Sequence, residues 1–168
     1  MRSLRSDPAT WREWPAYSSI PAPERLHRLT SGPMSGPTGL AVQRVFWNAA
    51  EKRAISVVFF GGGLCGWPGV VHGGTTATVM DESLGRVAVR NLEARTGVTA
   101  NLELSYRRPV LANRFYVVRA EEVGEGRSER KVWVKGTLED LEGKVCVEAK
   151  GLFVVPKGIQ LGEISEGF

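Results

Sequence analysis

The chain has 168 residues, of which 42% are hydrophobic and 24% charged, a composition typical of one globular domain with a real hydrophobic core. No apolar run approaches the roughly 18 residues of a membrane-spanning helix. The two cysteines, Cys65 and Cys146, exclude a disulfide scaffold and favour a reducing compartment, while two histidines, His27 and His72, argue against a multi-histidine metal site.

The formal charge of +4 is compatible with several kinds of partner. Nucleic acid, an anionic membrane surface and a phosphate-bearing small molecule would each favour a basic protein, and a mildly basic solvated surface explains the charge equally well. The chain has no block of five or more basic residues, which weakens the nucleic-acid interpretation. We therefore expect neither a nucleic-acid partner nor a membrane span.

Residues 1–39 differ in composition from the rest of the chain. Six of the nine prolines lie there among Ser, Gly and Arg residues. We interpret residues 1–39 as an extension that packs on the domain or stays mobile, with Trp11 and Trp14 as anchors. A cytoplasmic location is expected, with the mitochondrion as the alternative because arginines near the start of the chain are a weak targeting signal.

The remaining chain alternates apolar and polar residues in a pattern typical of β-structure. A glycine-rich loop, residues 61–69, separates two strands from one long helix, and four strands follow the helix. Because the turns between strands are short, we expect an α+β fold with a mostly antiparallel sheet, one face of which needs a partner. The expected strands are 40–48, 54–60, 98–106, 114–123, 130–138 and 145–155, and the expected helix is 73–93.

Two faces of the expected helix carry charge in different ways. Glu82, Arg86 and Arg90 recur on one face, where they predict a solvent-exposed ladder. Asp81 instead lies on a face with Ala77, Leu84 and Ala88, which we expect to point toward the core. An ionised carboxylate is expensive to bury without partners, so Asp81 is either hydrogen-bonded for structural reasons or held for chemistry.

The segment before this helix, Val71–Thr75, contains His72, Gly73 and Gly74. Two glycines at a helix start leave backbone N–H groups uncovered, and these donors together with the helix dipole favour negative charge, such as an oxyanion that develops during acyl transfer. The simpler alternatives are that the glycines only allow close backbone approach and that His72 is structural.

Distance along the helix separates these groups. Asp81 follows His72 by nine residues, which corresponds to roughly 13 Å of helix. A base and an oxyanion hole must both reach the reacting group, so one chain does not easily supply both. Two antiparallel helices related by a two-fold axis would bring each Asp81 to the partner's helix start, which gives two composite sites in a homodimer.

These residues resemble a known family. Residues 72–81 are similar to the H-G-G-x-x-A-T-x-x-D signature of hotdog-fold acyl-CoA thioesterases of the PaaI-like superfamily, and residues 99–109 are similar to the T-x-x-L-x-x-x-Y-x-x-P pattern of the following strand. The likeness runs from about Leu40 to Pro156. It implies a sheet wrapped around one long helix, a domain at residues 40–157 with a tail at 158–168, and a homodimer or homotetramer.

The resemblance also implies roles for individual residues. Asp81 matches the family's catalytic base or nucleophile, His72 and Gly73 match the groups that polarise the thioester carbonyl, and Thr99 matches the hydroxyl that positions water. The substrate is then an acyl-CoA, no separate cofactor is needed, and coenzyme A is part of the substrate. The expected substrate-binding residues are Gly74, Ser105, Arg107, Gly126, Arg127 and Ser128; the arginines alternatively only protect strand ends.

One position departs from the family pattern. Many members carry an asparagine six residues before the histidine, and this chain has Gly66 there. A non-catalytic acyl-CoA-binding protein and a hotdog hydratase or dehydratase therefore stay as alternatives to the thioesterase. The spacing Gly61, Gly63, Gly66 matches G-x-G-x-x-G, but no helix opens directly after it, which argues against a dinucleotide-binding motif.

Overall fold

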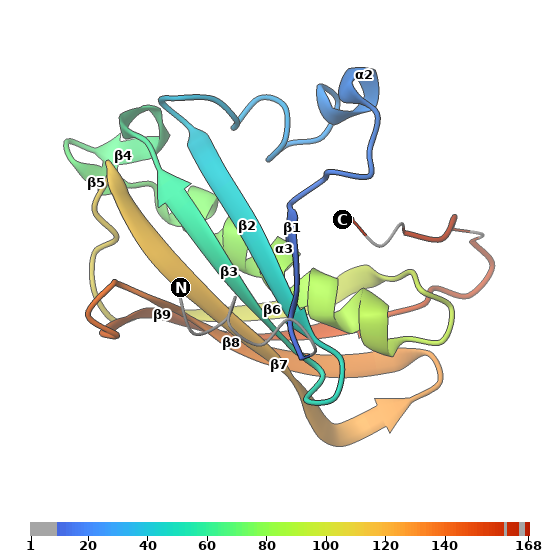
Figure 1. Ribbon diagram of the computed structural model, residues 1–168. Coiled ribbons are helices and arrows are strands. Elements are labelled where there is room, and N and C mark those ends of the chain that lie inside the picture. Colours follow the sequence, from blue (N-terminus) through green and yellow to red (C-terminus); the bar gives the residue numbers. More distant parts are fainter. Residues whose placement is uncertain (1–9, 160, 165–166) are drawn as a thin grey trace.

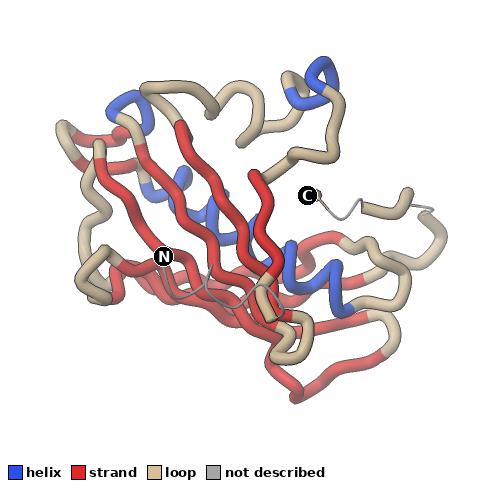
Figure 2. The backbone as a smooth tube through the Cα atoms, viewed as in Figure 1, coloured by secondary structure: helices blue, strands red, loops and turns tan. Residues whose placement is uncertain are grey.

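The computed structural model describes residues 10–159, 161–164 and 167–168. Their main element is a seven-stranded antiparallel sheet in the order β1-β2-β3-β7-β8-β9-β6, curved around helix α3 (Figure 1). Figure 2 shows the same wrapping of strands around the long helix. The elements are β1 (Arg12–Pro15), α2 (Ala22–Arg25), β2 (Leu40–Asn48), β3 (Arg53–Phe60), a short 3-10 turn (Gly62–Leu64), β4 (Cys65–Trp67), β5 (Val70–Val71), α3 (Gly73–Asn91), β6 (Val98–Tyr106), β7 (Arg114–Ser128), β8 (Lys131–Glu139) and β9 (Val145–Val154).

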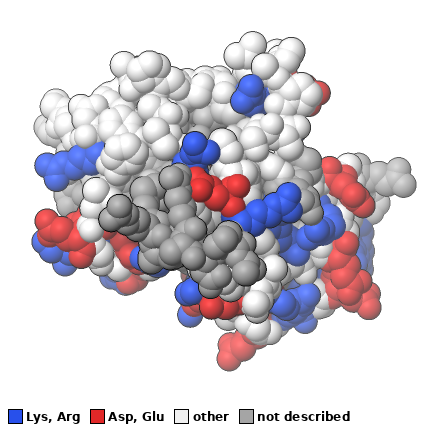
Figure 3. Space-filling view, viewed as in Figure 1, with Lys and Arg blue, Asp and Glu red and all other residues white. Residues whose placement is uncertain are grey.

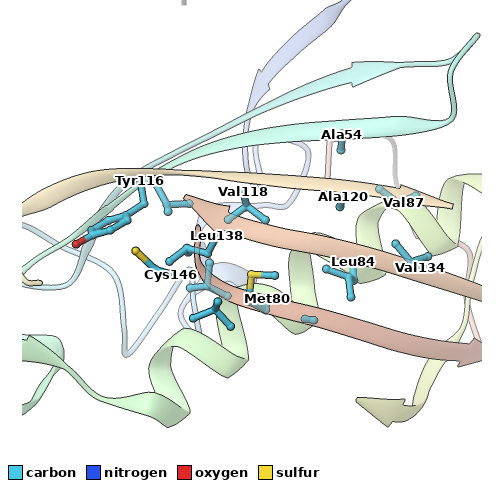
Figure 4. Close-up of a cluster of buried hydrophobic side chains, with 14 of the residues drawn as sticks. Ala54, Met80, Leu84, Val87, Tyr116, Val118, Ala120, Val134, Leu138 and Cys146 are labelled. Atoms are coloured by element: carbon cyan, nitrogen blue, oxygen red, sulfur yellow. The ribbon is translucent and has the colours of Figure 1, made fainter. Parts of the chain in front are cut away.

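The core lies between α3 and the concave face of the sheet. Met80, Leu84 and Val87 of the helix meet Val118 and Leu138 of the central strands (Figure 4), and all five side chains are almost fully buried. Burial of such apolar side chains stabilises the fold by about 1.5–3 kcal/mol each. This packing fixes α3 against the sheet along its length, which positions both ends of the helix.

The predicted antiparallel sheet around one long helix is confirmed, with differences at element ends. The helix ends at Asn91 rather than 93, because Leu92 already has extended backbone angles. Strand β7 continues to Ser128 instead of ending at 123. Four residues, 124–127, form an irregularity opposite β8 between the pairs Val123–Trp133 and Ser128–Lys131. Gly126, at φ +70°, accommodates this bulge without the strain that a side chain would add.

The described part of the extension, residues 10–39, packs on the rest of the chain. Strand β1 pairs with β2, so it adds an edge to the same sheet. Trp14 is buried, and Trp11 packs against a small apolar cluster on the outer face of β2 and β3. Residues 1–9 lie outside the described residues, and the division of the chain at residues 39 and 157 stays a prediction.

The expected solvent-exposed ladder on α3 is wrong at its centre. Arg86 is only 3% exposed, and its guanidinium lies 5.2 Å from the ring centroids of both Tyr17 and Phe168. Glu82 accepts hydrogen bonds from the Thr30 hydroxyl at 2.7 and 2.8 Å and pairs with Arg86 at 3.6 Å. The extension therefore covers the helix face that periodicity alone assigned to solvent.

Across the described residues, no helix is both long and apolar enough to cross a membrane. The same described part of the chain contains no group of three or more His, Cys, Asp or Glu side chains that could hold a metal ion.

Candidate functional site

The start of α3 is built around His72. Its extended backbone, at φ −60° and ψ 136°, makes His72 the N-cap residue, and its Nδ1 accepts a hydrogen bond from the Gly74 N–H at 2.9 Å. The Nδ1 atom that accepts this bond carries no proton, so Nε2 carries it and is available as a donor. A Cβ on residue 74 would lie 2.9 Å from Nδ1, so glycine at this position permits the cap.

Gly66 packs against the same imidazole. A Cβ at residue 66 would lie 2.6 Å from His72 Cδ2 and 3.2 Å from its Cα, closer than atoms tolerate. Glycine thus stands where many family members have asparagine because strand β4 passes close to His72 at this position. With Gly66, the imidazole occupies space that a side chain at 66 would otherwise fill.

Gly73 presents an open peptide donor beside a cavity. Gly73 is exposed, and its N–H is one of those that a helix start leaves without an intrahelical acceptor. Its carbonyl oxygen accepts a hydrogen bond from the Tyr106 hydroxyl at 2.8 Å, which ties the helix start to the end of β6. A cavity of about 370 Å³ opens here, lined by Gly73, Thr76, Tyr106, Arg107, Arg108 and the apolar residues around them.

Tyr106 is a site residue to which the sequence analysis assigned no role. It belongs to the T-x-x-L-x-x-x-Y pattern quoted there. The signal that could have identified it is its place on β6 at even spacing from Leu102 and Leu104, which pack toward the core. Even spacing puts the Tyr106 side chain on the face of β6 that meets α3.

Asp81 and Thr99 form the second half of the site. The Thr99 hydroxyl donates a hydrogen bond to Asp81 Oδ1 at 2.8 Å. Asp81 is half-buried on the flank of α3 next to β6, so the expectation that it points into the core is wrong; Met80 and Leu84 occupy the core-facing positions. The carboxylate is therefore both partnered and open to approach from outside.

A β-bulge turns Thr99 toward the helix. Regular alternation from Leu102 and Leu104 would put residue 99 on the outer face, but the pairing with β9 shifts register between Thr99 and Asn101. The extra residue, Ala100, reverses the alternation, so that Thr99 pairs with Phe153, whose side chain is in the core. The bulge creates the contact between Thr99 and Asp81.

The two halves lie apart within one chain. α3 is continuous from Gly73 to Asn91, and the eight residues from Gly73 to Asp81 span about 12 Å at the rise of an α-helix. Thr99 lies near the start of β6, and Tyr106 lies at its end. One chain therefore holds its carboxylate at one end of β6 and its bare peptide donor at the other.

The predicted substrate-binding residues are divided in the same way. Arg107 follows the end of β6 and pairs with Glu148 at 2.8 Å, near the helix start, and Ser105 is exposed on β6. Arg127 instead donates to the Asn91 carbonyl at the other end of α3 and pairs with Glu122 at 2.6 Å. Gly126 and Ser128 lie in the same stretch of β7 as Arg127, so one chain does not gather these residues at one place.

The segment of the chain that contains His72 carries no formal charge. Residues 54–80 include no Asp, Glu, Lys or Arg, and the surface over β4, β5 and the neighbouring loops is almost free of charged side chains at the upper left of Figure 3. The dipole of α3 therefore acts on a negative charge at the helix start together with the cations Arg107 and Arg108, which line the same cavity.

A family model matches the part of the chain that holds these residues. Residues 68–146, which contain the helix start, Asp81 and Thr99, match the family model of the thioesterase superfamily. This part of the chain therefore matches the thioesterase superfamily. Its antiparallel sheet around one long helix is the hotdog fold of that superfamily.

The similar proteins include a named thioesterase and an uncharacterized protein. The chain is 36% identical over 112 residues to mouse (Mus musculus) acyl-coenzyme A thioesterase THEM4, covering 66% of this chain and 46% of the relative. It is 31% identical over 147 residues to the Saccharomyces cerevisiae uncharacterized mitochondrial membrane protein FMP10, covering 84% and 59%. The chain thus spans about half the length of these relatives. A crystal structure of the thioesterase superfamily protein RHA08564 superposes with a TM-score of 0.59 at 26% identity, covering 67% of this chain and 56% of that one.

Proposed function

We propose that this chain is an acyl-CoA thioesterase that hydrolyses the thioester to a free acid and coenzyme A at sites shared between two copies of the chain. The observation that carries the proposal is the division of the site, with Asp81 and Thr99 at one end of β6 and Gly73 and His72 at the other. The match of residues 68–146 to the thioesterase superfamily and the likeness to acyl-coenzyme A thioesterase THEM4 support the reaction class.

Strand β6 is the surface on which the two copies pair. It is the last strand of the sheet, and its nine residues include one charged side chain, Glu103. The Arg107 N–H donates to the Cys146 carbonyl. Backbone N–H groups point alternately to the two sides of a strand, so the N–H groups of the odd-numbered residues before Arg107 also point to β9. The N–H groups of Leu102 and Leu104 point to the open edge. A long, almost uncharged edge is a template for another strand.

A two-fold axis through the middle of β6 assembles the site. If the two β6 strands pair antiparallel about Glu103, Leu102 of one copy lies opposite Leu104 of the other, and because Ala100 is an extra residue in the bulge, Thr99 lies opposite Tyr106. Asp81 and Thr99 of one copy then approach Gly73 and Arg107 of the other. Arg127 and Ser128 of the first copy approach the same region, where they and Ser105 bind the phosphates of coenzyme A.

The chemistry follows from the donors and the base. The Gly73 N–H, the dipole of α3 and Nε2–H of His72 polarise the acyl carbonyl and stabilise the oxyanion. Asp81 of the other copy removes a proton from a water that Thr99 helps to hold, and this water attacks the carbonyl carbon. Direct attack by Asp81 to form an anhydride is the alternative; ¹⁸O-labelled water in a single turnover distinguishes them, because only the anhydride route places label in the Asp81 carboxylate.

Thiol release from a panel of acyl-CoAs tests the reaction. We expect Asp81→Asn to lower the rate by about 10²–10⁴-fold, the usual contribution of a general base, because the amide does not accept the proton. Asp140→Asn serves as the control, since Asp140 lies in the turn between β8 and β9, away from α3. Thiol release that is unchanged by Asp81→Asn would reject the mechanism.

Mixing two inactive variants tests the shared site. Asp81→Ala and His72→Ala chains should each be inactive alone. If they exchange at random, one site in each mixed dimer is intact, so about a quarter of the sites recover wild-type activity. Absence of recovery in dimers verified as mixed would show that each chain carries its own complete site.

The compartment is part of the proposal. The name of the FMP10 relative assigns that protein to a mitochondrial membrane, and a Candida albicans relative, 28% identical, is also named as mitochondrial. These names favour the mitochondrial alternative over the expected cytoplasmic location. Fractionation of cells that produce the protein tests it.

A further inference from the structure

A second cavity lies at the C-terminal end of α3, on the opposite side of the helix from β6. Its volume is about 530 Å³, within the range of small-molecule sites. Three tryptophan side chains line it. Trp14 belongs to β1, Trp11 directly precedes β1, and Trp47 belongs to β2. Trp14 is buried and the other two are partly buried, so flat apolar surfaces are recessed in the cavity instead of protruding from the surface.

The indoles are held in place by a cation. The Arg90 guanidinium lies 4.4 Å from the ring centroid of Trp14 and 5.7 Å from that of Trp47. The Trp14 Nε1–H also donates to the Phe168 carbonyl at 3.2 Å. The aromatic wall is therefore ordered before any ligand arrives, which lowers the entropy lost on binding.

The remaining lining is cationic. Arg12, Lys52 and Arg95 line the cavity with Arg90, and no Asp or Glu is among the described residues that do so. Arg12 and Arg95 are exposed, and the Lys52 side chain is 52% exposed, with its Nζ 3.9 Å from Glu122. Lys and Arg side chains gather where β1 passes this end of α3 (Figure 3).

One further donor belongs to the cavity. Asn91 lines it, and the Asn91 Nδ2 atom is buried without a hydrogen-bond partner in the described part of the chain. A buried amide without a partner needs an acceptor, which a ligand can supply.

We propose that this cavity binds a nucleoside diphosphate, with the base on the indoles and the phosphates on the cations. Aromatic side chains stack on any base, and guanidinium and ammonium groups bind phosphate oxygens. The adenosine diphosphate part of coenzyme A and a free nucleotide share this chemistry. An anionic membrane fits less well, because membrane binding requires protruding apolar side chains and the three indoles are recessed.

The cavity borders the proposed coenzyme A residues but contains none of the catalytic ones. Arg127 donates to the carbonyl of Asn91, which lines the cavity, whereas neither Asp81 nor His72 lines it. Loss of thiol release in Asp81→Asn should leave nucleotide binding unchanged, which makes the two proposals independently testable.

Calorimetric titration of the full chain with ADP tests the proposal, with tryptophan fluorescence as a second signal. We expect binding that the double variant Lys52→Gln, Arg95→Gln weakens at least tenfold. The matched control is Arg119→Gln, Lys135→Gln, which removes the same charge from ion pairs on the outer face of the sheet and should bind ADP like the wild type. Inorganic pyrophosphate should bind at least tenfold more weakly than ADP, because it lacks a base.

The source of the nucleotide follows from two further arms. If coenzyme A competes with ADP, and if the double variant has a higher KM for acyl-CoA but not for acyl-pantetheine, the nucleotide is that of the substrate. If ADP binds and coenzyme A does not compete with it, the ligand is a free nucleotide. Either result supports the proposal. Equal ADP binding by the wild type and the double variant, pyrophosphate binding as tight as that of ADP, or binding to anionic phosphatidylserine vesicles in the absence of ADP binding would overturn it.

Discussion

At the scale of single residues, the conformation of His72 depends on two glycines. Gly74 leaves room for the bond from its own N–H to Nδ1, and Gly66 leaves room for the ring. The imidazole is thereby fixed with Nε2 as the free donor, next to the open Gly73 N–H. Preorganised donors of this kind stabilise developing negative charge without reorganisation during the reaction.

Gly66→Ala should therefore disturb both stability and activity. The new methyl group would lie 2.6 Å from His72 Cδ2, so the ring must move and the N-cap bond is lost, which lowers the free energy of unfolding by about 1 kcal/mol. Thiol release should fall with it. Gly62→Ala is the matched control, because a Cβ there meets nothing closer than 3.6 Å. Urea unfolding and thiol release of both variants check this; equal behaviour of the two would contradict it.

At the scale of elements, α3 has different surroundings on its two flanks. The flank with Asp81 lies next to the open strand β6, whereas the flank with Glu82 and Arg86 is covered by the extension through Tyr17 and Thr30. A buried ion pair is weak evidence for stability but requires partners in fixed positions. The contacts on the covered flank thus fix the rotation of α3 about its axis, and this rotation directs Asp81 toward β6.

The covered flank predicts a loss of stability at alkaline pH. Burial raises the pKa of the Tyr17 phenol far above 10.0, with Arg86 opposing and Glu82 adding to the shift. Above about pH 10 the unfolded chain loses the Tyr17 proton while the folded chain keeps it, so the unfolded state binds fewer protons and stability falls as pH rises.

Urea unfolding between pH 9 and 11 measures this loss. Each pH unit above the ordinary pKa should remove about 1.4 kcal/mol for this one proton. The Tyr17→Phe variant is less stable at neutral pH, but its free energy of unfolding should fall less steeply with pH, by the equivalent of one proton. Burial also raises the pKa of Tyr116, which contributes equally to the slopes of the wild type and the variant. Identical slopes in the two proteins would show that Tyr17 ionises freely in the fold.

At the scale of the whole molecule, the free edge of β6 determines whether the site is complete. Leu102 lies next to the proposed two-fold axis and directs its N–H to that edge. Leu102→Pro removes this donor and leaves the pairing with β9 in place. We expect the Leu102→Pro variant to be a monomer. Its rate of thiol release should be lower by at least about 10²-fold, because each chain lacks its partner's base.

Light scattering after size-exclusion chromatography measures the size of the particle. Leu102→Ala is the control, because it loses the same side chain and keeps the N–H; it should remain a dimer with activity near that of the wild type. A Leu102→Pro variant that stays dimeric and active would place the interface elsewhere.

Much of the fold could be predicted because its signals are local. Alternation located five strands to within one residue, as for 40–48 and 98–106, and placed the start of β7 but not its end; the glycines before residue 75 located the helix start. The motif of residues 72–81 also marked Asp81 and His72 as a pair that one helix keeps apart. The short strand β1 was missed, because four residues among prolines carry no periodic signal.

The order of elements, the composition of the helix start and the family resemblance could be predicted from the chain alone, since these depend on residue types at short spacing. The folded molecule was needed to show that a bulge at Ala100 turns Thr99 onto Asp81, that Gly66 lies against His72, and that the extension buries Arg86. Each of these depends on segments far apart in the chain meeting in one register, and a spacing pattern within one segment holds no information about which segment will cover it.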